Sequence, residues 1–263
     1  MIAVEARKQA LRLRTYIGLG LVALIPIIFT ASFKANPPKG HALGLFDLTA
    51  SGLNIPIAAL AAESAFLLIV VVSLFAGETI SGEANWGTLS YLLVRPVSRN
   101  RVLGSKLVVA AGLALLATLV VPVVGLAVGT LAFGWHPITT PSLTIVSQGS
   151  ALGRLALSTL YVAWSQAAYL SFAFMLSTMT DSAFAAVAGG VGLGVVSQIL
   201  NNISALNGTS YIYPTHYLDA WQHLFFQQGS STEMLRGVVL QLPYVLVFLG
   251  IAWWWFNRKD VLS

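Results

Sequence analysis

The stretch "LVVAAGLALLATLVVPVVGLAVGTLAF", from Leu107 to Phe133, contains no Asp, Glu, Lys or Arg. An α-helix needs about 20 apolar residues to cross roughly 30 Å of hydrocarbon, because each residue adds about 1.5 Å. The stretch therefore predicts a membrane-spanning helix. The whole chain has the same character: 57% of its residues are hydrophobic and 9% are charged, whereas a soluble domain is about 25% charged. We therefore expect lipid to cover much of the surface.

Five more apolar runs extend this prediction to an all-α polytopic membrane protein with six spans, which forms a single domain over residues 1–263. The predicted spans are residues 15–33, 55–76, 107–133, 155–180, 183–200 and 238–256. The chain has no cysteine, which excludes disulfides and thiolate metal sites. Glycine pairs at residues 125/129 and 190/194 have the G-x-x-x-G spacing that lets helices approach closely, within one chain or between two copies.

The basic residues predict the orientation of the spans. One side collects ten of them: Arg7, Lys8, Arg12, Arg14, Arg95, Arg99, Arg101, Lys106, Arg258 and Lys259. The other side receives four: Lys34, Lys39, Arg154 and Arg236. The positive-inside rule then places both termini in the cytoplasm, and an even number of spans requires the same. The net charge of +5 fits lipid headgroups better than nucleic acid, because the basic residues cluster at the ends of apolar runs.

The N-terminal segment "EARKQALRLR" combines helix-forming residues with four basic side chains and few apolar ones. It predicts a short interfacial helix that leads into the first span. The basic residues of this helix are Arg7, Lys8, Arg12 and Arg14.

The outer segment of residues 201–237 predicts an amphipathic helix that starts near Pro214. Tyr217, Trp221 and Phe225 would share its apolar face, in or against the outer leaflet. On the other face, the spacing of His216, Asp219 and His223 could hold a metal ion with one open position. The simpler interpretation, which we favour, is that these residues form the polar, water-exposed face of the amphipathic helix and bind no metal.

Glu63 is the one acidic residue inside a predicted span. Carboxylates within membranes are costly and usually face a bundle interior or water. Glu63 could line a path for substrate or protons. Alternatively, its carboxyl could bond to a neighbouring helix or reach the outer interface.

The stretch "GETISGEANWGTLSYLLVRPVSRNRVLGSK", Gly77–Lys106, lies between the second and third spans. Gly77 and Gly82 match part of a P-loop, but Glu83 follows where phosphate binding needs a lysine, so we expect no ATP binding and no enzymatic activity in this chain. The stretch should begin as a helix, become apolar at "LSYLLV" and break at Pro96. It could be a solvated loop, lie on the bilayer, or dock a soluble partner.

This stretch resembles the membrane subunits of type-2 ABC exporters. The shared pattern is an acidic residue, G-T-L, a leucine pair, P-V-S-R and a lysine that opens the next span; the matching residues are Glu83, Gly87, Thr88, Leu89, Leu92, Leu93, Pro96, Val97, Ser98, Arg99 and Lys106. The basic N-terminal helix, "LSTMTDSAFAA", the "PTH…W" segment and the C-terminal "WWWFNRKDVLS" extend the resemblance along the whole chain.

The resemblance implies a permease that pairs with a second copy or a paralogue. Two separate P-loop ATPase subunits would bind ATP and Mg beneath it, and this chain would hold no cofactor. The Glu78–Arg99 element would be the coupling helix that contacts an ATPase. Its implied coupling residues are Glu78, Glu83, Trp86, Gly87, Thr88, Leu89, Leu92, Leu93, Pro96 and Arg99. The segment around Tyr217, Trp221 and Phe225 would resemble the re-entrant helices at the exit of such exporters.

We therefore expect an ATP-driven exporter subunit in the inner (plasma) membrane of a bacterium, with a hydrophobic or amphipathic substrate. Two alternatives stay open: an ion-coupled secondary transporter and an intramembrane enzyme. An intramembrane enzyme needs several polar groups at membrane depth, and only Glu63 is available there. A secondary transporter often shows inverted repeats and broken helices with carboxylates near the membrane midplane, and neither pattern is visible in the sequence.

Overall fold

The structure is a computed structural model that describes residues 1–37, 49–85, 98–139, 145–206, 208–225 and 231–258. Its described part consists of helices and one short two-stranded ladder. The α-helices are α1 (Ile2–Ala10), α2 (Leu13–Ala35), α3 (Asn54–Ser64), α4 (Leu67–Asn85), α6 (Arg99–Phe133), α7 (Gln148–Ser165), α8 (Ala167–Met179), α9 (Ala183–Asn201) and α10 (Ser231–Arg258). Three 3-10 helices lie between α9 and α10: η2 (Ser204–Leu206), η3 (Ser210–Ile212) and η4 (Ala220–Phe225).

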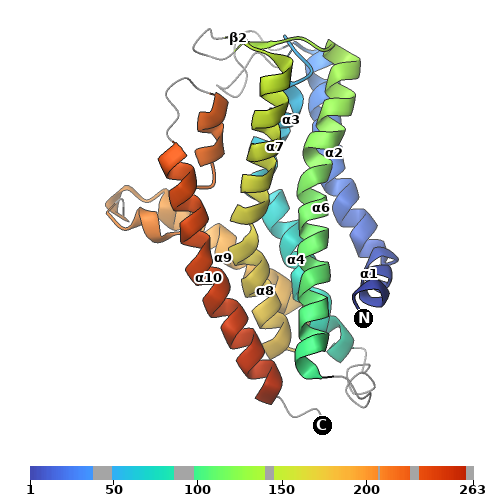
Figure 1. Cartoon of the computed structure of the whole chain (residues 1–263), viewed down its shortest axis with the longest axis vertical. Helices are drawn as coiled ribbons and strands as arrows, with labels where there is room; N and C mark the ends of the chain where they lie inside the picture. The colour runs from blue at the N-terminus through green and yellow to red at the C-terminus, as the bar shows by residue number, and fades with distance from the viewer. Residues whose placement is uncertain (38–48, 86–97, 140–144, 207, 226–230, 259–263) are drawn as a thin grey trace.

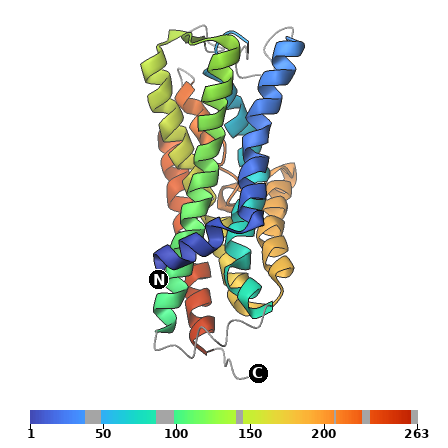
Figure 2. The same ribbon diagram turned by 90° about the vertical axis from the view of Figure 1, so that its right-hand side faces the viewer.

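The helices form an elongated bundle with two distinct ends (Figures 1 and 2). We call one the α1 end: it carries α1, the last turns of α4 and α8, the start of α6 and the C-terminal end of α10. The other is the β end, where β1 (Ile138–Thr139) pairs antiparallel with β2 (Ile145–Val146). At the β end the Ser51 hydroxyl also donates to the His136 carbonyl at 2.7 Å.

Long apolar helices make this chain a multi-pass membrane protein. Among the described residues, four helices are long and apolar enough to cross a bilayer by themselves: α2, α6, α9 and α10. The pair α3–α4 adds a fifth candidate span, with a bend of 60° between its two parts. Apolar side chains point outward along the bundle, for example Leu131 (86% exposed), Phe184 (81%) and Leu246 (70%), as expected where lipid takes the place of water.

Two predicted spans differ from single straight helices. The predicted span 55–76 is broken after Ser64, and its second part, α4, continues to Asn85. The predicted span 155–180 is divided at Gln166 into α7 and α8, neither of which is both long and apolar enough to cross alone. A run of apolar residues does not reveal such a break. The backbone loses hydrogen bonds there, and side-chain amides from distant parts of the sequence replace them.

The expected coupling element, Glu78–Arg99, begins as a helix, as predicted, but both of its ends belong to longer helices. Residues 78–85 form the last turns of α4, and Arg99 is the first residue of α6. Both spanning helices therefore extend beyond their predicted ends. The sequence between them, residues 86–97, lies outside the described residues.

Both glycine pairs lie at helix contacts within the chain. A Cβ added to Gly125 would lie 2.8 Å from the Cα of Pro56, so the pair in α6 lets α3 approach closely. A Cβ added to Gly190 would lie 2.6 Å from Ser73 Oγ and 2.8 Å from Ala173 Cβ. The pair in α9 therefore fits α9 against α4 and α8, as expected for small residues at helix interfaces in membranes.

Candidate functional site

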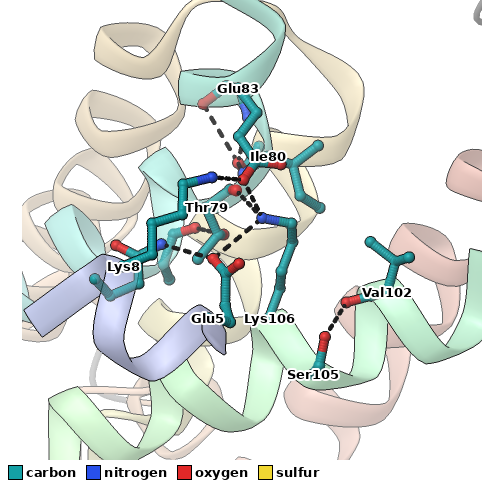
Figure 3. A network of polar contacts seen from close by, with 12 residues as sticks. Glu5, Lys8, Thr79, Ile80, Glu83, Val102, Ser105 and Lys106 are labelled. Carbon is teal, nitrogen blue, oxygen red and sulfur yellow. Dashed lines mark hydrogen bonds and ion pairs between the residues drawn. The ribbon is translucent and has the colours of Figure 1, made fainter. Parts of the chain in front are cut away.

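The most concentrated group of charges in the described structure lies at the α1 end, around Lys106 of α6. The Lys106 ammonium donates to Glu83 Oε1 at 2.8 Å, to Glu5 Oε1 at 3.2 Å and to the Thr79 carbonyl at 3.0 Å (Figure 3). Three donors therefore meet three acceptors. Lys106 is only 1% exposed, and these contacts compensate the cost of burying its charge.

Glu83 connects α4 to both other helices of this group. Its carboxylate accepts from Lys106 and also pairs with Lys8 of α1 (Figure 3). The Glu83 side chain is 1% exposed, whereas Lys8 is 39% exposed. The ion pairs of Glu5, Lys8, Glu83 and Lys106 thus join α1, α4 and α6; we call these four residues the α1 clamp.

A second set of contacts fixes the turn between α1 and α2. Arg14 pairs with Glu78 of α4, and its Nη2 donates to Gln9 Oε1 at 2.6 Å. Gln9 is buried, and its carbonyl accepts from the Thr15 hydroxyl at 2.7 Å. The turn is therefore attached to α4 independently of the α1 clamp.

The four basic residues predicted for the interfacial helix have different surroundings. Lys8 and Arg14 pair with acids of α4, Arg7 is exposed, and Arg12 is half-buried as the residue that precedes α2. The predicted N-terminal helix is present as α1. The structure shows that two of its charges bind protein carboxylates, so headgroup attraction alone does not account for its position.

The electrostatics of the clamp lower the pKa of one carboxyl outside the spans, that of Glu5. Burial by itself would raise this pKa. The Lys106 ammonium, the Gln9 amide and Lys8 together outweigh the effect of burial, so the pKa lies below its ordinary value of 4.5. Glu5 is therefore ionised at neutral pH and binds Lys106 as a carboxylate.

Arg99, predicted to contact an ATPase, contacts α10 in this structure. Its Nη1 donates to the Asn257 carbonyl at 3.1 Å and to the Phe256 carbonyl at 3.4 Å. A guanidinium is well suited to the unsatisfied carbonyls at a helix C-terminus. The start of α6 is thereby attached to the end of α10.

The predicted coupling residues are thus divided between two parts of the chain. Glu78, Glu83 and Arg99 lie in helices and contact other helices of the same chain. The remaining ones lie outside the described residues: Trp86, Gly87, Thr88, Leu89, Leu92, Leu93 and Pro96. Their role in coupling stays a prediction.

The outer segment forms short helices, as predicted, but its apolar face packs into the protein. Trp221 and Phe225 are 0% and 1% exposed, with ring centroids 6.3 Å apart in an edge-to-face arrangement. Tyr217 is half-buried, and its carbonyl accepts from Tyr161 at 2.6 Å. The conformation around Trp221 is the 3-10 helix η4, in place of the expected α-helix.

The three residues considered for a metal site take separate partners. His216 Nδ1 lies 2.8 Å from Asn201 Oδ1, Asp219 accepts from Gln222 at 3.1 Å, and His223 lies 2.9 Å from Glu233. Burial raises the pKa of Asp219, although the Gln222 amide opposes this. Within the described ranges, no three His, Cys, Asp or Glu side chains converge to hold a metal ion.

Sequence reasoning missed Glu5 and left Lys106 out of the coupling residues. Lys106 was identified only as the lysine that opens the third span. One signal could have pointed to it: a lysine within helix α6, several residues from its start, must find acceptors if neighbouring helices cover it. Glu63, at the end of α3, is 1% exposed.

The comparisons with known proteins agree with a membrane protein and assign no activity. The chain is 24% identical over 202 residues to the uncharacterised protein YhcI of Bacillus subtilis (strain 168), which covers 72% of this chain and 63% of YhcI. It is 26% identical over 204 residues to the uncharacterised membrane protein YdbK of the same organism, which covers 74% of this chain and 78% of YdbK. The sequence pattern of DUF2705, described as a protein of unknown function, matches residues 49–262. Because that match covers most of the sequence, the chain belongs to the DUF2705 family.

Proposed function

We propose that this chain is the permease subunit of an ATP-driven exporter of the type-2 ABC class, powered by separate P-loop ATPase subunits. The observation that supports the proposal best is the α1 clamp. It joins α1 to α4 and α6, the two helices that flank residues 86–97, where the exporter-like motif is concentrated. A force applied to that motif would therefore reach α1 and both helices together.

In this proposal the α1 end faces the cytoplasm, where the ATPases bind. Three features support this orientation: the basic residues gather at that end, α1 lies across the bundle there, and the C-terminal end of α10 is at the same end (Figures 1 and 2). α7 and α8 would together form one further span, the fourth along the chain, and bring the total to six, since only Gln166 separates them and Figure 1 shows one following the other along the bundle. The membrane would be the plasma membrane of a bacterium.

Transport would follow from two conformations with different affinity for the closed ATPases. A second copy or a paralogue would complete the translocation path. The outward face of the bundle is apolar, so a hydrophobic or amphipathic cargo, able to enter from the lipid, fits better than a sugar.

The experiment that tests the proposal is copurification of the full chain, in detergent, with a candidate P-loop ATPase, which is to be sought in an adjacent reading frame. We expect a stable complex that hydrolyses ATP, while the pure chain hydrolyses none. Replacing residues 87–89 with alanines should abolish the complex, and the matched substitution Ile145→Ala, at an exposed position of the β end, should leave it intact. ATP turnover by the pure chain, or an intact complex after the alanine replacement, would refute the proposal.

A further inference from the structure

The break between α3 and α4 is held by two glutamine side chains. Gln166 Nε2 donates to the Ser64 carbonyl at 3.0 Å, and the Gln198 amide donates to the Ala65 carbonyl. Gln166 itself occupies the junction between α7 and α8. Two interrupted helix pairs are therefore joined at one place, by amides that satisfy carbonyls released from the helical pattern.

This place lies deep in the bundle. α3 extends from Asn54 to Ser64, or about 15 Å at 1.5 Å per residue. From Leu67 to Thr79, where the Lys106 contacts begin, α4 rises about 18 Å. Measured along the two helices, the break is thus roughly equidistant from the β end and the charged α1 end.

Glu63 is in the last turn of α3, beside the break. Its side chain is 1% exposed, and neither carboxyl oxygen has a hydrogen-bond partner among the described residues. The C-terminal end of a helix carries partial negative charge. An ionised carboxylate here would face that charge while shielded from bulk water, and no basic side chain of the described residues pairs with it.

Charged groups on the surrounding helices do not compensate Glu63. α3 packs against α2, α4, α6 and α7. The acidic and basic residues of α2, α4 and α6 lie toward the ends of those helices. On α7, Arg154 and Tyr161 bond to the carbonyls of Leu224 and Tyr217 at 2.7 and 2.6 Å. The phenols of Tyr161 and of Tyr169 in α8 are neutral in their ordinary form, so they carry no charge that could compensate Glu63.

We propose that Glu63 is a proton-binding site at this break, occupied in the conformation described, and that opening the contacts of Gln166 and Gln198 lets the proton leave. Burying an unpaired carboxylate costs so much that a buried carboxyl without a partner takes up a proton. Water that enters at an opened break would solvate the carboxylate and remove this cost. The site would make the conformation of the broken span sensitive to protons.

A proton fits the site better than an alkali ion. A cation such as Na⁺ needs several oxygen ligands at once, and the two carbonyls at the break already accept from glutamine amides. A proton needs one carboxyl oxygen. The inference does not depend on the proposed ATPase partner, because it concerns groups of this chain alone.

Infrared spectroscopy of the full chain in lipid nanodiscs tests the proposal, through the carbonyl stretch of a protonated carboxylic acid and its shift in heavy water. At pH 7 we expect this band in the native chain, its loss in Glu63→Gln, and its retention in the control Asp219→Asn. Glu63→Asp should keep the band at a shifted position, which covers the case in which Glu63→Gln does not fold. Gln198→Leu should lower the pH at which the band disappears.

Two results would overturn the inference. One is a native chain without an acid band that depends on Glu63, which would mean that the carboxyl is ionised. The other is loss of the band when Na⁺ replaces a large organic cation at constant pH, which would assign the site to an alkali ion.

Discussion

Replacing Lys106 with methionine should destabilise the protein strongly, because it removes the centre of the α1 clamp. Lys106 and Glu83 are 2% and 1% exposed in their side chains and lie 2.8 Å apart. Removing one member of a buried ion pair leaves the other charge uncompensated, at a cost of about 3–5 kcal/mol. Lys8 cannot replace the lost partner fully, because it is 39% exposed and water screens its charge.

The pairwise contribution follows from a double-mutant cycle with Glu83→Gln. The double variant buries neither charge of this pair, so its loss of stability should be smaller than the sum of the single losses, by about 0.5–3 kcal/mol. Equilibrium unfolding in mixed micelles with increasing SDS measures all four proteins. The control Arg101→Met changes an exposed residue of the same helix and should shift stability by no more than about 0.5 kcal/mol. Strictly additive losses, or a Lys106→Met variant as stable as the control, would refute the reasoning.

Three further predictions concern α1, the topology and helix packing. Because the pKa of Glu5 is lowered on folding, its contribution to stability is complete above 4.5, the ordinary value, and is lost as the pH falls through the folded value. The protection of the α1 amides against hydrogen exchange, relative to their intrinsic rates at each pH, should therefore fall in acid, and Glu5→Gln should remove the part of this dependence that Glu5 causes. Since the chain lacks cysteine, a single introduced cysteine reports on which side of the membrane its position lies. A thiol reagent that cannot cross the membrane, added to intact cells, should label Trp135→Cys and spare Ser182→Cys. The reverse pattern would contradict the proposed orientation. Gly190→Ala should cost about 1–3 kcal/mol by overpacking, whereas Gly192→Ala, which has nothing within 4 Å, should be neutral or stabilising; equal effects would argue against the packing described.

The long helices were the most predictable part of the structure. Uncharged runs of sufficient length gave α2, α6, α9 and α10 within a few residues at most ends, because hydrocarbon requires continuous apolar helices. The start of α6 was missed: it begins at Arg99, well before Leu107, since Lys106 and its partners let a charged turn remain helical within the protein.

Contacts between distant segments could not be predicted. The bend after Ser64 depends on Gln166 and Gln198, which lie about a hundred residues or more away in the sequence. The same holds for Glu83, whose local sequence suggested a cytoplasmic motif that faces a soluble partner, while its neighbours in space are Lys8 and Lys106. Local patterns indicate which residues are unusual, but they do not give the partner.

The most direct test of the central claim, that the α1 end of this chain receives an ATPase, is site-specific photocrosslinking in cells that produce the chain and its candidate ATPase. A photoreactive amino acid at position 86 should crosslink to the ATPase, with a yield that changes when ATP hydrolysis is blocked. The same group at Ile145, exposed at the β end, should give no such product. Crosslinks to the ATPase from Ile145, or none from position 86 while the chain is correctly inserted, would contradict the account.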